Sequence, residues 1–241
     1  MHFQHSMQIW RDFPELVPGV LFVDSLGTAG TASTAAAVAA AIAEFTAVAA
    51  SRLANASEAE LSEVQAWRHA FSKMGLKPTQ YRCASEALLR RFRKEGSLPR
   101  VHPLVDLCNA ASLAFAIPVA AIDVSKIDGN LDVRYAIGDE RYLSFAGEVE
   151  HPNAGEVIYV DGAGAAHARR WTNRQSGASA VRDSTTSALI VTEAMHASAF
   201  QDVADLLAAL SEKLDAFRSS TLVTAILSRP SPSFSFEYGR S

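Results

Sequence analysis

The chain has 241 residues, 49% of them hydrophobic, so it can bury the core of one large or two small domains. Its formal net charge is −4, which gives no general argument for a nucleic-acid-binding protein. The first residues contain no basic segment followed by an apolar run, so no secretory signal is predicted. The two cysteines, Cys83 and Cys108, form no zinc-binding pattern. They are typical of a reducing, cytoplasmic compartment, with a single disulfide as the alternative.

Residues 1–60 are predicted to form a strand and a long helix that pack on the main domain. Met7 is an alternative start, which would leave residues 1–6 as a disordered lead. The strand covers Val20–Asp24, and the Ala-rich helix covers about Ser33–Ala54. The least polar stretch is mostly Ala and Thr and is shorter than the ~20 strongly apolar residues of a membrane span. The helix is therefore interpreted as buried, and no membrane partner is predicted.

Three further helices each carry a start or stop signal. Ser57 and Glu60 form a capping box that opens the first, which stops at Gly75. The second opens with Ser85 as its predicted cap, and the third covers Pro103–Phe115.

Beyond Pro118 the pattern changes to short strands rich in β-branched and aromatic residues. The predicted strands are Val119–Asp123, Leu131–Tyr135, Tyr142–Phe145, Val157–Val160, Ala165–Trp171 and Leu189–Glu193. Gly162 and Gly164 predict a hairpin turn between two of them. Helices first and strands later predict an α+β fold with mixed or antiparallel sheets flanked by helices.

A last amphipathic helix is predicted over about Ala199–Ser219. Its apolar positions recur at helical spacing: Phe200, Val203, Leu206, Leu207, Leu210, Leu214 and Phe217. The tail, residues 221–241, has no hydrophobic period and is predicted to be loosely ordered. The main domain is therefore assigned to residues 61–220.

Basic side chains are concentrated in residues 67–100. This segment has a net charge of +7, whereas residues 1–66 and 101–241 have net charges of −5 and −6. A solvated helical face and a patch that contacts phosphates are both open interpretations. Lys77, Arg90 and Arg91 are the candidate RNA-binding residues, and DNA is not expected as a partner.

Common catalytic signatures are missing from the sequence. There is no G-x-S-x-G, no H-E-x-x-H and no Walker A pattern, and the seven histidines show no i, i+4 pair. Neither a metal site nor a cofactor is predicted.

Several blocks between about residues 60 and 195 nevertheless form a recognisable series. In order they are Ala66-Trp67-Arg68, Gly75–Thr79, Tyr81–Arg91, Leu98-Pro99, Leu104–Asn109, Ile117–Asp123, Lys126–Gly129, Gly155–Tyr159 and Arg169–Arg174. Their order and spacing resemble free-standing B3/B4 domain proteins, and the region is similar to the editing domain of the phenylalanyl-tRNA synthetase β-subunit. Two features depart from the synthetase pattern. A histidine of that pattern falls on Ala120, and Trp171–Arg174 replaces its Gly-rich loop.

The resemblance implies hydrolysis of the ester that joins a wrong amino acid to the 3′ end of tRNA. Such an ester is already activated, so positioning a water and stabilising the oxyanion can suffice, with help from the terminal ribose hydroxyl. By the same resemblance, Asp106, Asn109 and Glu193 are the candidate catalytic residues. Arg82, Glu156, Trp171 and Arg174 are the candidate substrate-binding residues, and all but Trp171 are expected to converge with the catalytic set on one cleft.

Each implied role has an alternative. Asn109, on the same helix face as Asp106, would orient the water or cap a loop. Glu193 would bind the substrate amine or side chain, or make a surface pair. Glu156 would approach a ligand beside Gly155 or serve a turn. Trp171 would stack on the terminal adenine or pack between strands.

Arg82 and Arg174 would hold the terminal phosphates or pair with an internal carboxylate.

Two rival functions remain open: a non-catalytic module that binds RNA or an amino acid, and a metabolic enzyme or small-molecule binder that reuses the fold. The amino acid, the tRNA and the oligomeric state are not determined by the sequence.

Overall fold

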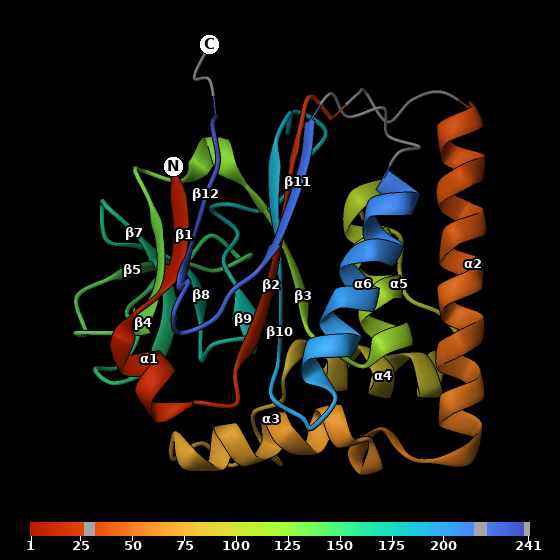
Figure 1. Ribbon diagram of the computed structural model, residues 1–241, viewed down its shortest axis with the longest axis horizontal. Coiled ribbons are helices and arrows are strands. Elements are labelled where there is room, and N and C mark those ends of the chain that lie inside the picture. Colours follow the sequence, from red (N-terminus) through yellow and green to blue (C-terminus); the bar gives the residue numbers. More distant parts are fainter. Residues whose placement is uncertain (27–31, 215–220, 239–241) are drawn as a thin grey trace.

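The computed structural model describes residues 1–26, 32–214 and 221–238, with the side chains of residues 32–34 left aside. Figure 1 shows four layers: a large sheet, a smaller sheet, the helix pair α5 and α6, and the long helix α2 outermost. Helices α3 and α4 lie across one end of these layers. The predicted α+β class with mixed and antiparallel sheets flanked by helices is confirmed.

The smaller sheet has four antiparallel strands in the order β11-β2-β10-β3. Its strands are β2 (Val17–Asp24), β3 (Val119–Asp123), β10 (Ala188–Ala194) and β11 (Thr221–Ile226). The strand β10 lies between β2 and β3, so both of its edges are paired and all seven of its residues are buried.

The larger sheet is mixed. Its strands follow the order β12-β1-β4-β7-β8-β5-β6, and β9 also pairs with β8. The pairs β1–β4 and β5–β8 are parallel, and the others are antiparallel. The strand bounds are β1 (His2–His5), β4 (Leu131–Tyr135), β5 (Arg141–Leu143), β6 (Val149–Glu150), β7 (Val157–Asp161), β8 (Ala165–Arg169), β9 (Arg174–Gln175) and β12 (Ser233–Ser235).

Side chains of β10 alternate between two faces of the smaller sheet, as the twofold period of a strand requires. Leu189 and Val191 join the core between the two sheets, whereas Ile190 joins the core under the helices. Glu193 has the parity of Leu189 and Val191, so it points into the space between the sheets. These surfaces are called the inner face, toward the larger sheet, and the outer face, toward the helices.

The outer face is covered by α5 (Pro103–Phe115) and α6 (Ala199–Leu214). Gly19 of β2 lets α6 approach closely, because a Cβ at this position would lie 2.6 Å from Val203 Cγ1 and 2.9 Å from Thr192 Cγ2. The predicted core face of α6 is confirmed at its leucines and Val203, but Phe200 is 66% exposed. Phe200 is one residue into the helix, where its side chain turns outward; Phe217 lies outside the described residues.

The helix α2 (Ala32–Asn55) packs on α5 along a single stripe formed by Val38, Ala41, Ile42, Phe45 and Ala49. The expectation of a buried helix is therefore wrong for its other faces, where alanines are exposed. Residues Ala35–Asn55 are also long and apolar enough to cross a membrane, contrary to the expectation from the sequence. Length and composition alone do not separate such a span from a helix packed on one side of a folded domain.

The capping box of Ser57 and Glu60 is confirmed, although it caps a 3-10 turn (Glu58–Glu60) that precedes α3 (Ser62–Lys73). Helix α4 (Ala84–Glu95) begins one residue before Ser85, with Cys83 at its N-cap. Ser85 is thus not the cap; it is fully buried in the first turn and contacts the Cys83 thiol at 3.4 Å. Gly96 ends α4 with φ 74°, the left-handed conformation that glycine adopts at low cost.

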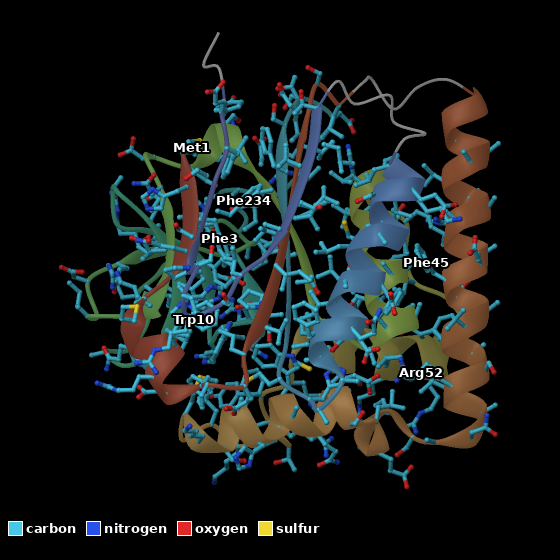
Figure 2. All side chains as sticks on the ribbon, in the orientation of Figure 1. Met1, Phe3, Trp10, Phe45, Arg52 and Phe234 are labelled. Atoms are coloured by element: carbon cyan, nitrogen blue, oxygen red, sulfur yellow. The ribbon has the colours of Figure 1, made fainter. Side chains whose placement is uncertain are left out.

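Both chain ends belong to the fold. The expected disordered lead forms β1, which pairs with β4 and β12, and Phe3 is fully buried. A short helix, α1 (Met7–Asp12), follows it. The tail, expected to be loose, contributes β11 to the smaller sheet and β12 to the larger one. Figure 2 shows Met1, Phe3 and Phe234 side by side, and Phe3 and Phe234 are partners in the pairing of β1 with β12. Pairing with distant strands thus orders two segments that lack a strong local sequence pattern.

Candidate functional site

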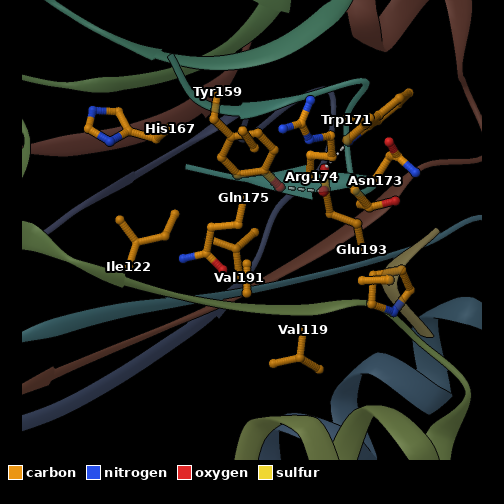
Figure 3. A pocket seen from close by; sticks show the side chains of 15 residues that line it. Val119, Ile122, Tyr159, His167, Trp171, Asn173, Arg174, Gln175, Val191 and Glu193 are labelled. Carbon is orange, nitrogen blue, oxygen red and sulfur yellow. Dashed lines mark hydrogen bonds between the residues drawn. The ribbon is translucent and has the colours of Figure 1, made fainter. Parts of the chain in front are cut away.

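A pocket of about 80 Å³ opens between the two sheets and is called here the inter-sheet pocket. Three groups of side chains form it: apolar residues of β3 and β10, residues of β7 and β8, and the turn that leads into β9. Its lining residues are Ala84, Pro118, Val119, Ala120, Ile122, Tyr159, His167, Ala168, Trp171, Thr172, Asn173, Arg174, Gln175, Val191 and Glu193. Figure 3 shows these side chains gathered from both sheets around one space.

The carboxylate of Glu193 is the most heavily bonded group of this pocket. Glu193 is 1% exposed, and its Oε1 accepts hydrogen bonds from Trp171 Nε1 at 2.9 Å and from His5 Nε2 at 2.6 Å. The hydroxyl of Tyr159 donates to Oε2 (Figure 3). Burial, followed by the adjacent Glu193 carboxylate, raises the pKa of Tyr159 well above its usual range, so the phenol keeps its proton and remains a donor.

The backbone at Glu193 is also held in place. Trp67 Nε1 donates to the Glu193 carbonyl oxygen at 3.2 Å, and the Trp67 and Trp171 rings meet edge to face with centroids 5.1 Å apart. The rings of Phe13 and Trp171 are similarly close, at 4.8 Å. This packing fixes the positions of the donors that surround the carboxylate.

A tight turn between β8 and β9 closes one side of the pocket. Arg170 and Trp171 have φ values of 49° and 57°, a conformation that non-glycine residues rarely adopt. The turn is held because Trp171 N donates to Val157 O at 2.7 Å and Ala84 N donates to Thr172 O at 2.9 Å. Backbone strain of this kind persists only where the surroundings enforce it, and it occurs often at functional sites.

The same turn contributes polar residues to the pocket lining. Thr172 Oγ1 is buried and has no hydrogen-bond partner. Asn173 Nδ2 donates to Arg82 O at 2.8 Å, and Gln175 Nε2 donates to Ala121 O at 2.8 Å, which leaves the side-chain oxygen of each amide as an acceptor. Thr172, Asn173 and Gln175, together with His167, whose Nδ1 has no partner, therefore keep hydrogen-bonding capacity among the residues that line the pocket.

The expectation that the predicted residues converge on one cleft is wrong for Asp106 and Asn109. They share one face of α5, as their spacing predicts, but this face looks toward α2 and the α4–α5 loop. There they line a second cavity of about 240 Å³, called here the helical groove. Asp106 accepts from Val101 N at 2.9 Å, so it fastens the loop that precedes α5.

Trp171 cannot stack on a base as predicted, because its ring is fully buried between Phe13 and Trp67. Packing between structural elements, the alternative interpretation, is what the structure shows. Arg174 does line the pocket, but its guanidinium binds both oxygens of Glu150 at 3.0 Å.

Glu156 lies outside the pocket lining and binds Arg169 through two hydrogen bonds of 2.8 and 3.1 Å. Arg82 lies next to the pocket, with its backbone bonded to Asn173, while its side chain donates to Thr79 O at 2.7 Å and approaches Glu86. Of the six residues expected to converge, Arg174 and Glu193 line the inter-sheet pocket and Arg82 adjoins it.

Much of the basic segment is paired with carboxylates. Arg68 and Arg82 approach Glu86, and Arg91 binds Glu95 at 2.8 Å. Glu58, which precedes the segment, is 2.9 Å from Arg93 and 3.7 Å from Arg90. The candidate RNA-binding side chains of Lys77, Arg90 and Arg91 are nevertheless exposed.

Six residues of this region were not predicted as site residues from the sequence: His5, Tyr159, His167, Thr172, Asn173 and Gln175. His167 Nε2 is 3.1 Å from Asp161 Oδ2. Burial would raise the pKa of Asp161, but hydrogen bonds from His167 and from backbone amides lower it to about 2. The sequence did contain a signal for Tyr159: it lies in a correctly predicted strand, and the alternation of side chains along that strand places it on the inward face.

A separate cluster of potential metal ligands joins Glu63, His196 and Asp202, whose ligand atoms lie within 4.8 Å of one another. These groups already bind protein partners. Arg52 binds Glu63 at 2.5 Å, and His196 binds Asp202 at 2.6 Å. The Arg52 guanidinium offsets the charge of the Glu63 carboxylate.

The family described as B3/4 domain matches residues 66–218, which is more than half of the chain and contains every residue that lines the inter-sheet pocket. The chain belongs to the B3/4 domain family. Over 74 residues it is 31% identical to a phenylalanine–tRNA ligase β-subunit from Legionella pneumophila (strain Lens). That match covers 31% of this chain and only 9% of the ligase subunit.

A solved structure also resembles the chain: an N-terminal fragment of the phenylalanyl-tRNA synthetase β-subunit from Pyrococcus horikoshii. The TM-score is 0.47 at 9% sequence identity, over 93% of this chain and 53% of that fragment. The resemblance noted in the sequence is confirmed: the chain carries a B3/4 domain related to that of the synthetase β-subunit.

Proposed function

We propose that this protein is an aminoacyl-tRNA deacylase that hydrolyses the ester of a mischarged tRNA, acting in the cytoplasm. The observation that carries the proposal is the inter-sheet pocket inside the B3/4 region. It combines an apolar recess with a strained turn that offers the unpartnered hydroxyl of Thr172 and the amide of Asn173. The relation to a phenylalanine–tRNA ligase subunit supports tRNA as the partner.

In this proposal the aminoacyl side chain enters the recess and the ester lies against the turn. Thr172 and Asn173 hold the attacking water and the ester carbonyl, which positions the reacting atoms without a covalent enzyme intermediate. The water oxygen bonds to the carbonyl carbon, and the bond to the ribose oxygen breaks. The water proton passes to that ribose oxygen through the neighbouring ribose hydroxyl, which releases the amino acid and tRNA.

The rest of the tRNA would lie over the basic end of the molecule. Arg82 adjoins the pocket through its bond to Asn173, and exposed Lys77, Arg90 and Arg91 extend the cationic surface along the α3–α4 loop and α4. Contacts of this type with phosphates make binding depend strongly on salt concentration.

The test is a deacylation assay with a panel of mischarged tRNAs, comparing the wild type with Thr172→Val and Asn173→Ala. Hydrolysis by the wild type, with a loss of at least about tenfold in each variant, is the expected result. Absence of hydrolysis with every aminoacyl-tRNA would remove the proposal.

A second candidate, a non-catalytic module that binds tRNA or an amino acid, is favoured by one observation. The Glu193 carboxylate of the pocket already accepts three hydrogen bonds from protein groups, so it is not poised as a general base. Salt-sensitive tRNA binding without hydrolysis would support this candidate.

A further inference from the structure

The size of the inter-sheet pocket is set by side chains that cannot move aside at low cost. Tyr159 and Trp171 form one wall and are 3% and 0% exposed. Both donate hydrogen bonds to the buried Glu193 carboxylate, so a rotation of either ring would leave that carboxylate short of a partner. The wall is therefore rigid.

The opposite wall is made of strand residues rather than mobile loops. Ala120 and Ile122 belong to β3, which pairs with the central strand β10, and Ala120 lies directly opposite Val191 of β10. Ala168 of β8 lies beside Tyr159 in the larger sheet and adds a small side chain to the first wall. No long flexible side chain on the opposite wall can withdraw to enlarge the space.

The volume decides which groups fit. The pocket measures about 80 Å³, whereas an engineered cavity that binds benzene measures roughly 150 Å³. The pocket therefore has about half the volume of a cavity that accepts a benzene ring. A phenyl or phenol side chain exceeds this space, while the side chains of alanine, serine, threonine and valine do not.

The carboxylate of Glu193 is also engaged by the chain itself. Its two oxygens accept from Trp171, His5 and Tyr159, and the Tyr159 hydroxyl occupies the side that faces β7. These three donors fill most of the roughly four acceptor positions of a carboxylate, so little of Glu193 is left for a substrate hydroxyl.

We infer that the inter-sheet pocket selects aminoacyl groups with small aliphatic or hydroxylated side chains and rejects aromatic ones, with Tyr159 as the residue that sets the limit. Glu193 is a positioning residue, which holds Tyr159 and Trp171 in place. This inference rests on the proposed function for its biological substrate, but the binding preference itself requires no hydrolysis.

The test measures binding of stable analogues in which adenosine carries the amino acid through a 3′-amide. Isothermal titration of the wild type is expected to show alanyl, seryl and valyl analogues binding at least about tenfold more tightly than phenylalanyl and tyrosyl analogues. Tyr159→Ala should raise affinity for the phenylalanyl analogue at least about tenfold, whereas Tyr159→Phe, which keeps the ring, should retain the wild-type ranking.

Two further variants keep the inference testable if Tyr159→Ala fails to fold. Ala120→Leu fills the recess and should weaken the valyl analogue at least about tenfold, while Ala87→Leu on the exposed side of α4 should not. Preference of the wild type for aromatic analogues, or binding of none, would overturn the inference. Hydrolysis of aromatic aminoacyl-tRNA would overturn the inferred preference for small side chains but would support the proposed deacylase function. Preferential binding of the small analogues without any hydrolysis would support the inferred preference and overturn the deacylase function.

Discussion

The two faces of the four-stranded sheet handle polar groups in different ways. On the inner face Glu193 is fully enclosed, and donors from β1, β7 and the β8–β9 turn converge on its carboxylate. Beyond the outer face, between α5 and α2, the polar residues Asp106 and Asn109 line a larger groove, where Asp106 accepts from the loop amide of Val101 and approaches Arg100 at 4.0 Å.

This difference indicates that the inter-sheet pocket, rather than the helical groove, is suited to discriminate between ligands. A buried and fully bonded carboxylate surrounded by packed aromatic rings produces a preorganised wall. A groove bordered by the surface helix α2 and a loop lacks such cross-links between distant elements. The inner face is therefore expected to control both stability and substrate choice, and the outer face to control helix packing.

The largest expected effect is on stability when Glu193 is removed. Glu193→Ala leaves His5, Tyr159 and Trp171 as buried donors without their acceptor, so a loss of about 3–5 kcal/mol in the free energy of unfolding is expected. Urea denaturation measures this change. Asp106→Ala in the helical groove is the matched control, with an expected loss of about 1 kcal/mol. Equal losses would break the distinction between the two faces.

The next effect separates the two cavities by activity. Thr172→Val removes the unpartnered hydroxyl of the inter-sheet pocket and is expected to lower kcat/KM for deacylation about a hundredfold. Asn109→Ala in the helical groove is expected to stay within about twofold of the wild type. A large loss in Asn109→Ala, with Thr172→Val close to the wild type, would indicate that the reaction takes place in the helical groove.

A smaller effect tests the close approach on the outer face. In Gly19→Ala the new Cβ would overlap Val203 Cγ1, so α6 must shift and stability should fall by about 1–3 kcal/mol. Urea denaturation again gives the value. The double variant Gly19→Ala with Val203→Ala should show a favourable coupling, because the second change removes the overlapping atom. Simple additivity of the two losses would show that the overlap is absent.

The smallest effect concerns acid. The pKa of Asp161 is lowered in the folded protein to about 2 from 3.8, so its contribution to stability is present above about pH 4. That contribution is lost as the pH falls toward about 2. The difference in unfolding free energy between the wild type and Asp161→Asn should therefore shrink across this window. Asp139→Asn, in an exposed turn, is the control, and an unchanged Asp161→Asn difference at low pH would contradict the assignment.

The sequence by itself determined the helices and central strands with strong periodicity. Helix Pro103–Phe115 and strands Val119–Asp123 and Leu131–Tyr135 have the predicted bounds, because local hydrophobic period and helix-capping signals specify them. The ordered blocks from residue 66 onward identified the family, which the family match confirms. The alternation of side chains along the predicted strand Leu189–Glu193 also placed Glu193 on the same face as Leu189 and Val191.

Only the tertiary structure decided which groups meet. The strands β1, β11 and β12 carry weak local signals and form because they pair with strands more than 100 residues away or complete a sheet edge. His5 therefore reaches Glu193 across 188 positions of sequence. The spacing of Asp106 and Asn109 placed them on one helix face, but the packing of α5 against α2 turned that face away from Glu193. Periodicity specifies the direction of a side chain within its element, whereas long-range packing specifies what lies in that direction.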